Sequence, residues 1–161
     1  MDGVVADFDG YTITHLGKTL SEFQKSQEGW DAIASISQDM YLKMEPMADA
    51  DYLVSSVIAL GKIYGFGVGV LTAIPKFNRV PLAEEHKRMW LKQYYPKLLT
   101  DFNIGPHAVD KQNHCKKGDI LIDDNDKNIP QWRAKGGVGI FHTTAVNSVA
   151  ELLKHLRGSN E

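Results

Sequence analysis

Short apolar runs that alternate with segments of helical spacing constrain the fold of this 161-residue chain most strongly. Three of the runs are typical of buried strands, and they lie at 67–71, 119–122 and 138–141. Strands that alternate with helices favour a parallel sheet with helices packed on both of its faces. We therefore expect an α/β fold with three layers, α/β/α.

Helix-start and helix-stop signals set the expected helix boundaries. Asp49 or Asp51 can cap a helix that Gly65 ends, and Pro81 fits the first turn of the next helix. Ser148 begins a capping-box pattern near the C-terminus. We predict helices over 51–64, 79–95 and 128–135, and a last helix that starts at Asn147 or Ser148.

The segment 11–47 shows neither the alternation of a strand nor one continuous helical stripe. Two or three short helices fit its apolar residues, and we interpret it as a small helical cap inserted into the domain. The chain length fits a single domain, 1–161, that includes such an insertion. Further along, Ala108-Val109 is predicted as an additional short strand.

Composition and charge argue against several classes of protein. The formal net charge of −2 gives no electrostatic reason to expect a nucleic-acid polymer or an anionic membrane as partner, although a small nucleotide could enter a locally basic pocket. The apolar window 54–75 contains Lys62 and four glycines, which argues against a membrane span. Cys115 is the only cysteine, so no intrachain disulfide can form and a reducing, cytoplasmic location is expected. A zinc site with His107 and His114 is disfavoured, because no second cysteine or spaced histidine pair supports it.

Polar residues come at the ends of two expected strands. Thr72 ends the first apolar run and Asp123-Asp124 ends the second, while the first ten residues form an acidic, Gly-containing start. In a parallel α/β sheet the carboxyl ends of the strands border the ligand-binding edge, so we expect Thr72 and Asp123 to be neighbours there. A hydroxyl and carboxylates at such an edge suggest a site for Mg²⁺ and phosphate.

Several short motifs, taken in chain order, resemble those of a known family. They lie at 1–8, 44–47, 71–75, 87–91, 109–111 and 120–124. They are similar to the haloacid dehalogenase (HAD) superfamily of aspartate-nucleophile phosphatases and, within it, to the 5'(3')-deoxyribonucleotidases. The resemblance covers nearly the whole chain apart from most of the cap. It implies a Rossmann-like HAD fold and a cytosolic, Mg²⁺-dependent hydrolase that dephosphorylates deoxyribonucleoside monophosphates through an aspartyl-phosphate.

The resemblance also implies a role for each matching acidic residue. Asp2 matches the general acid/base, whose backbone carbonyl also touches the metal in the family. Asp123 and Asp124 match the acidic pair, at least one of which binds Mg²⁺. The metal set implied for this chain is therefore Asp2, Asp123 and Asp124.

The implied phosphate and substrate contacts come from other segments. Thr72 matches the phosphate-binding hydroxyl, and either Lys87 or Lys111 matches the phosphate-binding lysine. Both lysines are kept as candidates. Further contacts with the nucleotide are expected at Phe8, Ala73 and Trp30.

The nucleophilic aspartate of the family should stand one residue before Met1, where this sequence has no residue. We interpret Met1 as the middle residue of this motif, and the family's central first strand would precede it. A second register places the nucleophile at Asp7 and the acid at Asp9, with Tyr11 where Thr or Val is usual. We favour the register with Asp2, and we expect the chain to bind phosphate but to hydrolyse deoxynucleotides poorly.

Other functions fit part of the same pattern. A catalytically silent, HAD-like nucleotide- or phosphate-binding protein is the alternative that a missing nucleophile implies. A phospho-acceptor receiver domain is disfavoured, because receivers place the acidic pair early and the lysine last. A small cap leaves a phosphatase site open, so a homodimer partner could complete it.

Overall fold

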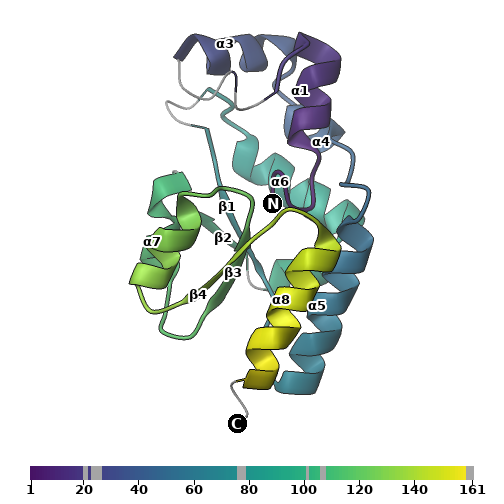
Figure 1. Ribbon diagram of the computed structural model, residues 1–161. Coiled ribbons are helices and arrows are strands. Elements are labelled where there is room, and N and C mark those ends of the chain that lie inside the picture. Colours follow the sequence, from purple (N-terminus) through teal and green to yellow (C-terminus); the bar gives the residue numbers. More distant parts are fainter. Residues whose placement is uncertain (20–21, 23–26, 76–78, 101, 106–107, 159–161) are drawn as a thin grey trace.

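A computed structural model describes residues 1–19, 22, 27–75, 79–100, 102–105 and 108–158. It shows a mixed α/β protein in which helices surround short parallel strands (Figure 1). In chain order the elements are α1 (Phe8–Leu16), α3 (Gln27–Ile36), α4 (Met40–Lys43), α5 (Ala50–Tyr64), β1 (Val70–Ala73), α6 (Ala83–Tyr94), the 3₁₀ helix η2 (Pro96–Thr100), β2 (Phe102–Gly105), the 3₁₀ helix η3 (Ala108–His114), β3 (Ile120–Asp123), α7 (Asn128–Ala134), β4 (Val138–Phe141) and α8 (Ala145–Gly158).

The strands of the described residues form two separate parallel pairs. In one pair Thr72 of β1 lies opposite Ile104 of β2, and in the other Asp123 of β3 lies opposite Phe141 of β4. No backbone ladder joins the two pairs within the part of the chain that is described. The predicted mixed α/β class is therefore confirmed. The described strands do not form the single continuous sheet between two helical layers that we expected.

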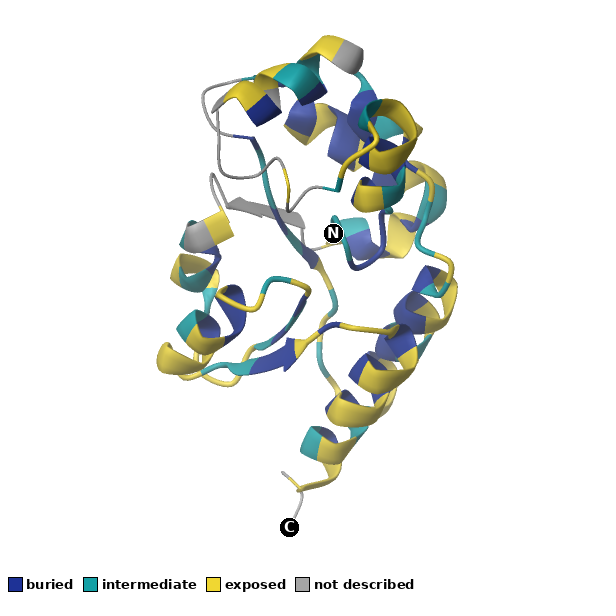
Figure 2. Ribbon diagram, turned by 45° about the horizontal axis from the view of Figure 1, so that its top comes forward, coloured by how far each residue is buried: buried dark blue, intermediate teal, exposed yellow. Residues whose placement is uncertain are grey.

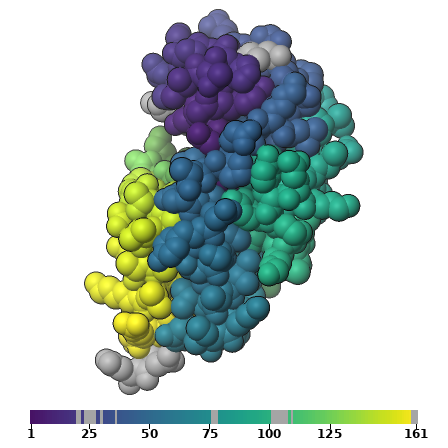
Figure 3. All heavy atoms as spheres, turned by 90° about the vertical axis from the view of Figure 1, so that its right-hand side faces the viewer, coloured from purple at the N-terminus to yellow at the C-terminus, as the bar shows by residue number. Residues whose placement is uncertain are grey.

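Two long helices pack together along one side of the molecule. Figure 3 shows α5 and α8 side by side, and Figure 1 shows α7 on the other side of the β3–β4 pair. Both helices turn apolar stripes inward, as the dark blue faces in Figure 2 show. The buried residues of these stripes include Leu53, Val54, Val57, Leu60, Val149, Leu152 and Leu156. Gly65 ends α5 in a left-handed conformation with φ of 78°, as its sequence position predicts.

Several predicted boundaries are wrong. Ala108-Val109 is not a strand but begins η3, and the sequence pattern gave no indication of β2. The last helix begins at Ala145, because Thr144 accepts a hydrogen bond from the backbone of Asn147 at 3.2 Å. Ser148 is thus buried inside α8 rather than capping it. The helix expected from 79 begins only at Ala83.

Short helices occupy the segment that was interpreted as a cap. α3 and α4 lie within 11–47, and α1 overlaps its start, above the strands in the view of Figure 1. α1 begins before Tyr11 because the carboxylate of Asp7 accepts a hydrogen bond from the backbone of Gly10 at 2.8 Å. Among the described residues, no helix combines the length and apolar character needed to cross a membrane.

Candidate active site

The first residues fold into a compact loop that leaves the side chain of Asp2 partly buried. The backbone amide of Gly3 donates to the carbonyl of Ala6 at 2.9 Å, and the amide of Val5 donates to that of Met1 at 2.8 Å. Ala6 also forms an isolated bridge with Pro46 in the segment that leads to α5. This anchoring holds the Asp2 side chain against α6 and the end of β1.

Lys87 of α6 joins the N-terminal loop to β1. Its Nζ lies 2.6 Å from Asp2 Oδ2, 2.9 Å from Thr72 Oγ1 and 2.7 Å from the carbonyl oxygen of Ala73. The ring of Tyr41 contributes a cation–π contact, with 4.4 Å between Nζ and its centroid. Burial lowers the pKa of Lys87, and the carboxylate of Asp2 opposes that shift. An ammonium group has three N–H donors, so these acceptors satisfy all of them.

Lys111 of η3 forms the second ion pair, with Asp123 of β3. Its Nζ lies 2.5 Å from Asp123 Oδ2, at the end of β3. Asp123 Oδ1 accepts hydrogen bonds from the backbone of Asn125 at 3.0 Å and from Asn128 Nδ2 at 2.9 Å. Burial alone would raise the pKa of Asp123, but the attraction of Lys111 and these hydrogen bonds outweigh it and lower the pKa below its ordinary value.

Gly3 brings the two ion pairs together. It has φ of 68°, and a Cβ at this position would lie only 2.7 Å from Cγ of Asp124. The carboxylate of Asp124 therefore lies directly against the backbone between Asp2 and Val4. Asp124 keeps part of its surface exposed to solvent. Desolvation of its carboxylate raises the pKa of Asp124, the amino group of Met1 opposes this shift, and the negative charge of Asp123 adds to it. The N-terminal loop and the end of β3 thus border one site.

The carboxylate oxygens of this site differ in the number of hydrogen bonds that they already accept. Oδ1 of Asp2 is buried and has no hydrogen-bond partner among the described residues. Both oxygens of Asp123 already accept hydrogen bonds. In the part of the chain that is described, no group of three His, Cys, Asp or Glu side chains is close enough to hold a metal ion. Asp2 and Asp124 are therefore the better candidates for hard-cation ligands, and Asp123 is chiefly the partner of Lys111.

The residues expected to contact a nucleotide are distributed differently. Phe8 is buried in the core, with its ring 6.2 Å from that of Tyr41, so it does not offer a free face to a substrate here. Ala73 takes part through its carbonyl oxygen, which accepts from Lys87. Trp30 belongs to α3, but its side chain lies outside the described residues.

The second register of the acidic motif is not supported by the geometry. Asp7 caps α1 through Gly10, and Asp9 is exposed on that helix. Val4 and Val5 lie in a turn rather than in a strand that would end at Asp7. The structure thus brings together Asp2, Thr72, Lys87, Lys111, Asp123 and Asp124, but not Asp7 or Asp9.

Sequence reasoning missed three residues that shape the site. Tyr41 covers the ammonium of Lys87, Asn128 holds Asp123, and Gly3 admits the carboxylate of Asp124. Only the contact of Asn128 could have been predicted from the sequence. Asn128 is the first residue of the helix after Asp123, so its side chain can donate a hydrogen bond back to the end of the strand. Among the described residues, Cys115 and His114 belong to no group of three side chains that could hold a metal ion. His107 lies outside the described residues.

Comparisons of the chain with protein-family models, with curated proteins and with solved structures found no match.

Proposed function

We propose that this chain provides the phosphate-binding and metal-binding site of a Mg²⁺-dependent phosphomonoester hydrolase of the HAD type. Deoxyribonucleoside monophosphates are the proposed substrates. The proposed intermediate is an aspartyl-phosphate, formed on an aspartate that is not among the described residues of this site. One observation carries the proposal. Asp2, which is partly buried, forms one cluster with the buried residues Thr72 and Lys87, and Gly3 connects this cluster to Asp124, next to the Lys111–Asp123 pair.

The two lysines have different roles in this proposal. Lys87 is completely buried, and three protein acceptors already engage its ammonium group, so it positions Asp2 and Thr72. The ammonium group of Lys111 donates a hydrogen bond only to Asp123 among the described residues, so two of its three N–H donors remain for a phosphate oxygen. Lys111 is therefore the proposed phosphate-binding lysine, and Lys87 is a positioning residue.

Asp2 is the proposed general acid/base. One of its oxygens is held by Lys87, while Oδ1 has no described partner and can exchange a proton with the ester oxygen or with water. The hydroxyl of Thr72 accepts from Lys87 and donates its own proton to the carbonyl oxygen of Ala73 at 3.5 Å. In this proposal a phosphate oxygen would replace that distant acceptor. The protein residues thus bind and orient the phosphate and provide the proton.

The charge of the site makes a divalent cation reasonable. Asp2, Asp123 and Asp124 carry three negative charges against two positive charges on Lys87 and Lys111. Burial lowers the pKa of the Met1 amino group in the same site to about 6, so this group is mostly neutral at pH 7 and a phosphate dianion would enter a site of net negative charge. When bound, Mg²⁺ would offset this repulsion and polarise the phosphate oxygens. Asp2 and Asp124 would hold it, and Mg²⁺ commonly needs only one or two carboxylates besides water.

A phosphate- or nucleotide-binding protein without turnover is the second candidate. Asp7, the other residue considered as nucleophile, is used to cap α1. In the cluster itself, Asp2 and Asp123 are paired with lysines. The described residues therefore present a site that can bind phosphate, and they do not present an unpaired carboxylate in a clear nucleophile position.

Calorimetric titration and phosphate release together test the proposal. Mg²⁺ and inorganic phosphate are titrated into the chain, and release of phosphate from deoxyuridine monophosphate is followed in parallel. Asp124→Asn should weaken Mg²⁺ binding, and Lys111→Met should weaken phosphate binding by about tenfold or more, as expected for loss of a charge-assisted hydrogen bond. Lys116→Met, at an exposed lysine outside the cluster, is the matched control and should change neither.

The outcomes separate the two candidates. Binding with turnover supports the hydrolase, and binding with no turnover supports the silent binding protein. If Lys111→Met and Lys116→Met bind phosphate as the unmodified chain does, the assignment of this site is wrong.

A further inference from the structure

A largely apolar cavity of about 930 Å³ lies between the two strand pairs. It is lined by the segment 67–71, which runs into β1, and by the segment 118–122, which runs into β3. Side chains of α5 and α8, including Leu53 and Leu152, also line it. Pockets for small molecules commonly have about 300–1,000 Å³ and mostly apolar walls, so this cavity has the size and lining of a ligand site.

The lining changes from buried and apolar to exposed and polar along the cavity. Val4, Val70 and Leu121 line it and are buried, with no more than 8% of each residue exposed. His114 and Lys116, in the segment before β3, also line it but are exposed. The cavity therefore extends from the core to the solvent, which it reaches at His114 and Lys116.

Two glycines leave room where the lining is exposed. Gly67 and Gly118 both line the cavity, and both are exposed. A Cβ added to either glycine would have no atom within 4 Å. An elongated molecule could therefore enter between the segments that lead into β1 and β3 without displacing a side chain at these positions.

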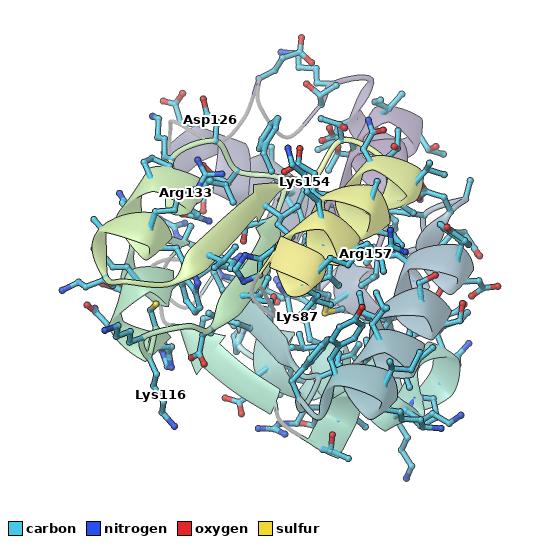
Figure 4. All side chains as sticks on the ribbon, turned by 60° about the horizontal axis from the view of Figure 1, so that its bottom comes forward. Lys87, Lys116, Asp126, Arg133, Lys154 and Arg157 are labelled. Carbon is cyan, nitrogen blue, oxygen red and sulfur yellow. The ribbon has the colours of Figure 1, made fainter. Side chains whose placement is uncertain are left out.

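The charged residues around the opening favour an anionic group. Lys116 carries a positive charge, and the imidazoles of His114 and His155 become positive when they bind a proton. Among the described residues that line the cavity, Asp119 is the only acidic one, and its carboxylate accepts a hydrogen bond from the backbone of Lys116 at 2.9 Å. Figure 4 shows Lys116 at the rim of the molecule with its side chain pointing away from the ribbon, which leaves the ammonium group in the solvent, where a head group would lie.

We propose that this cavity binds one single-chain carboxylic acid, with its alkyl tail among the buried apolar residues of the lining and its carboxylate at Lys116. The five residues 67–71 span at most about 17 Å when extended. An extended alkyl chain of about twelve carbons, with bonds of about 1.5 Å, spans roughly 14 Å. Dodecanoate is therefore the probe of matching length. This inference rests on the cavity and on the charges at its opening, and not on the proposed phosphatase activity.

Calorimetric titration of the full chain with dodecanoate, below the concentration at which it forms micelles, tests the proposal. One molecule should bind with a dissociation constant below about 100 µM. Burial of each CH₂ group tightens binding about fourfold, so decanoate should bind at least about tenfold more weakly. Dodecylammonium has the same tail with a positive head group and should bind at least about threefold more weakly than dodecanoate.

A pair of matched variants locates the tail. Ile120→Trp adds bulk to the lining from β3 and should weaken dodecanoate binding by at least about tenfold. Ile63→Trp makes the same change in α5 at a residue that is 73% exposed and does not line the cavity. It should bind dodecanoate as the unmodified chain does.

A second pair locates the head group. Lys116→Met should weaken dodecanoate binding by about threefold, as expected for an exposed ion pair, and should leave the binding of dodecanol unchanged. Lys127→Met, at an exposed lysine that does not line the cavity, should change neither.

Trp132 gives a readout that keeps the proposal testable if Ile120→Trp does not fold. Its side chain lines the cavity. Dodecanoate that carries bromine on its tail should quench the fluorescence of the unmodified chain to saturation at one molecule per chain. This quenching should be lost in Trp132→Phe.

Each outcome supports or overturns the proposal. Absence of saturable dodecanoate binding would overturn it, and so would binding of several molecules per chain or equal binding by the two Trp variants. Equal binding of dodecanoate and dodecylammonium would refute the carboxylate head group. Because these readouts need no phosphate ester, dodecanoate binding without phosphate release would contradict only the hydrolase. Phosphate release without dodecanoate binding would contradict only this inference.

Discussion

Lys87 is completely buried, and its ammonium group donates hydrogen bonds to Asp2, Thr72 and the carbonyl oxygen of Ala73. Removing Lys87 is costly, because the carboxylate of Asp2, with only 24% of its side chain exposed, then loses its partner in a largely buried position. Lys87→Met should therefore lower the free energy of unfolding by about 3–5 kcal/mol, measured by urea denaturation.

Lys116→Met makes the same chemical change at an exposed position and should stay within about 0.5 kcal/mol of the unmodified chain. If the two variants were equally stable, Lys87 would not be the residue that fixes Asp2. The comparison thus separates loss of the buried pair from loss of a positive charge in general.

Gly3 offers a second test at the level of single residues. Its φ of 68° is strained for any other residue, and a Cβ here would collide with the carboxylate of Asp124. Gly17, at the end of α1, has φ of 67° and nothing within 4 Å of an added Cβ. Gly3→Ala and Gly17→Ala should share a backbone cost of about 1–2 kcal/mol, but only Gly3→Ala should also displace Asp124.

Calorimetric titration with Mg²⁺ measures that displacement. Binding should weaken in Gly3→Ala and remain unchanged in Gly17→Ala. Equal binding by the two variants would mean that contact between Gly3 and Asp124 does not shape the cation site.

At the level of elements, Asp49 ties the start of one long helix to the start of the other. Its Oδ2 accepts a hydrogen bond from the backbone of Ala145 at 2.7 Å, so a residue next to α5 satisfies the first turn of α8. The side chain makes no capping bond to α5 itself. A negative charge at a helix N-terminus also interacts favourably with the helix dipole.

Asp49→Ala should consequently lower the free energy of unfolding by about 1 kcal/mol, the typical loss when a helix-capping acceptor is removed. Urea denaturation gives the value. Asp126→Ala, at an exposed loop aspartate, should leave the stability nearly unchanged. A loss of the same size in both variants would indicate a general charge effect instead of a specific link between α5 and α8.

His142 connects the end of β4 to α8 through a contact of 2.9 Å between its Nδ1 and Ser148 Oγ. Burial lowers its pKa below the ordinary value of 6.5, although Asp49 opposes the shift. The unfolded chain therefore binds a proton at a higher pH than the folded chain does. Stability from this group is present above about pH 6.5 and decreases as the pH falls toward the folded pKa.

This coupling predicts a slope of at most about 1.4 kcal/mol per pH unit from His142, below about pH 6.5. Urea denaturation at several pH values between 7.5 and 5 should give a shallower slope for His142→Asn than for the unmodified chain. His15→Gln, at an exposed histidine, should keep the original slope. An unchanged slope in His142→Asn would show that His142 does not contribute to the pH dependence of stability.

On the scale of the whole molecule, the sequence predicts which residues gather at the site better than it predicts the sheet. Thr72 and Asp123 follow clear apolar runs, so their placement near the carboxyl ends of parallel strands follows from local pattern. The strand predicted at 67–71 is nevertheless shifted, because β1 begins at Val70 and continues through Thr72 to Ala73. β4 was predicted with its observed limits, since its run 138–141 is bounded by glycines and polar residues.

The remaining features depend on contacts between distant segments. β2 contains Asn103 and Gly105 next to only two apolar residues, and its pairing with β1 is what makes it a strand. The choice between Lys87 and Lys111 could not be made from spacing. Lys87 and Asp2 are separated by 85 positions of the chain, and Lys111 reaches Asp123 from η3, which packs against α7, β1 and β2.

The Lys111–Asp123 pair links η3, β3 and α7, so its titration should be visible in the acid stability of the whole molecule. The pKa of Asp123 is lowered because Lys111 and hydrogen-bond donors outweigh the opposing effect of burial. A carboxyl group with a lowered pKa stabilises the fold above its pKa in the unfolded chain, about 3.9, and this contribution disappears as the pH falls through the folded pKa.

Asp123→Asn should therefore be less stable at pH 7, but its stability should fall less steeply below about pH 4. Circular dichroism during acid titration, combined with urea denaturation at each pH, measures both effects, and Asp126→Asn is the matched control at an exposed aspartate. An acid slope in Asp123→Asn as steep as that of the control would show that other carboxyl groups govern acid unfolding.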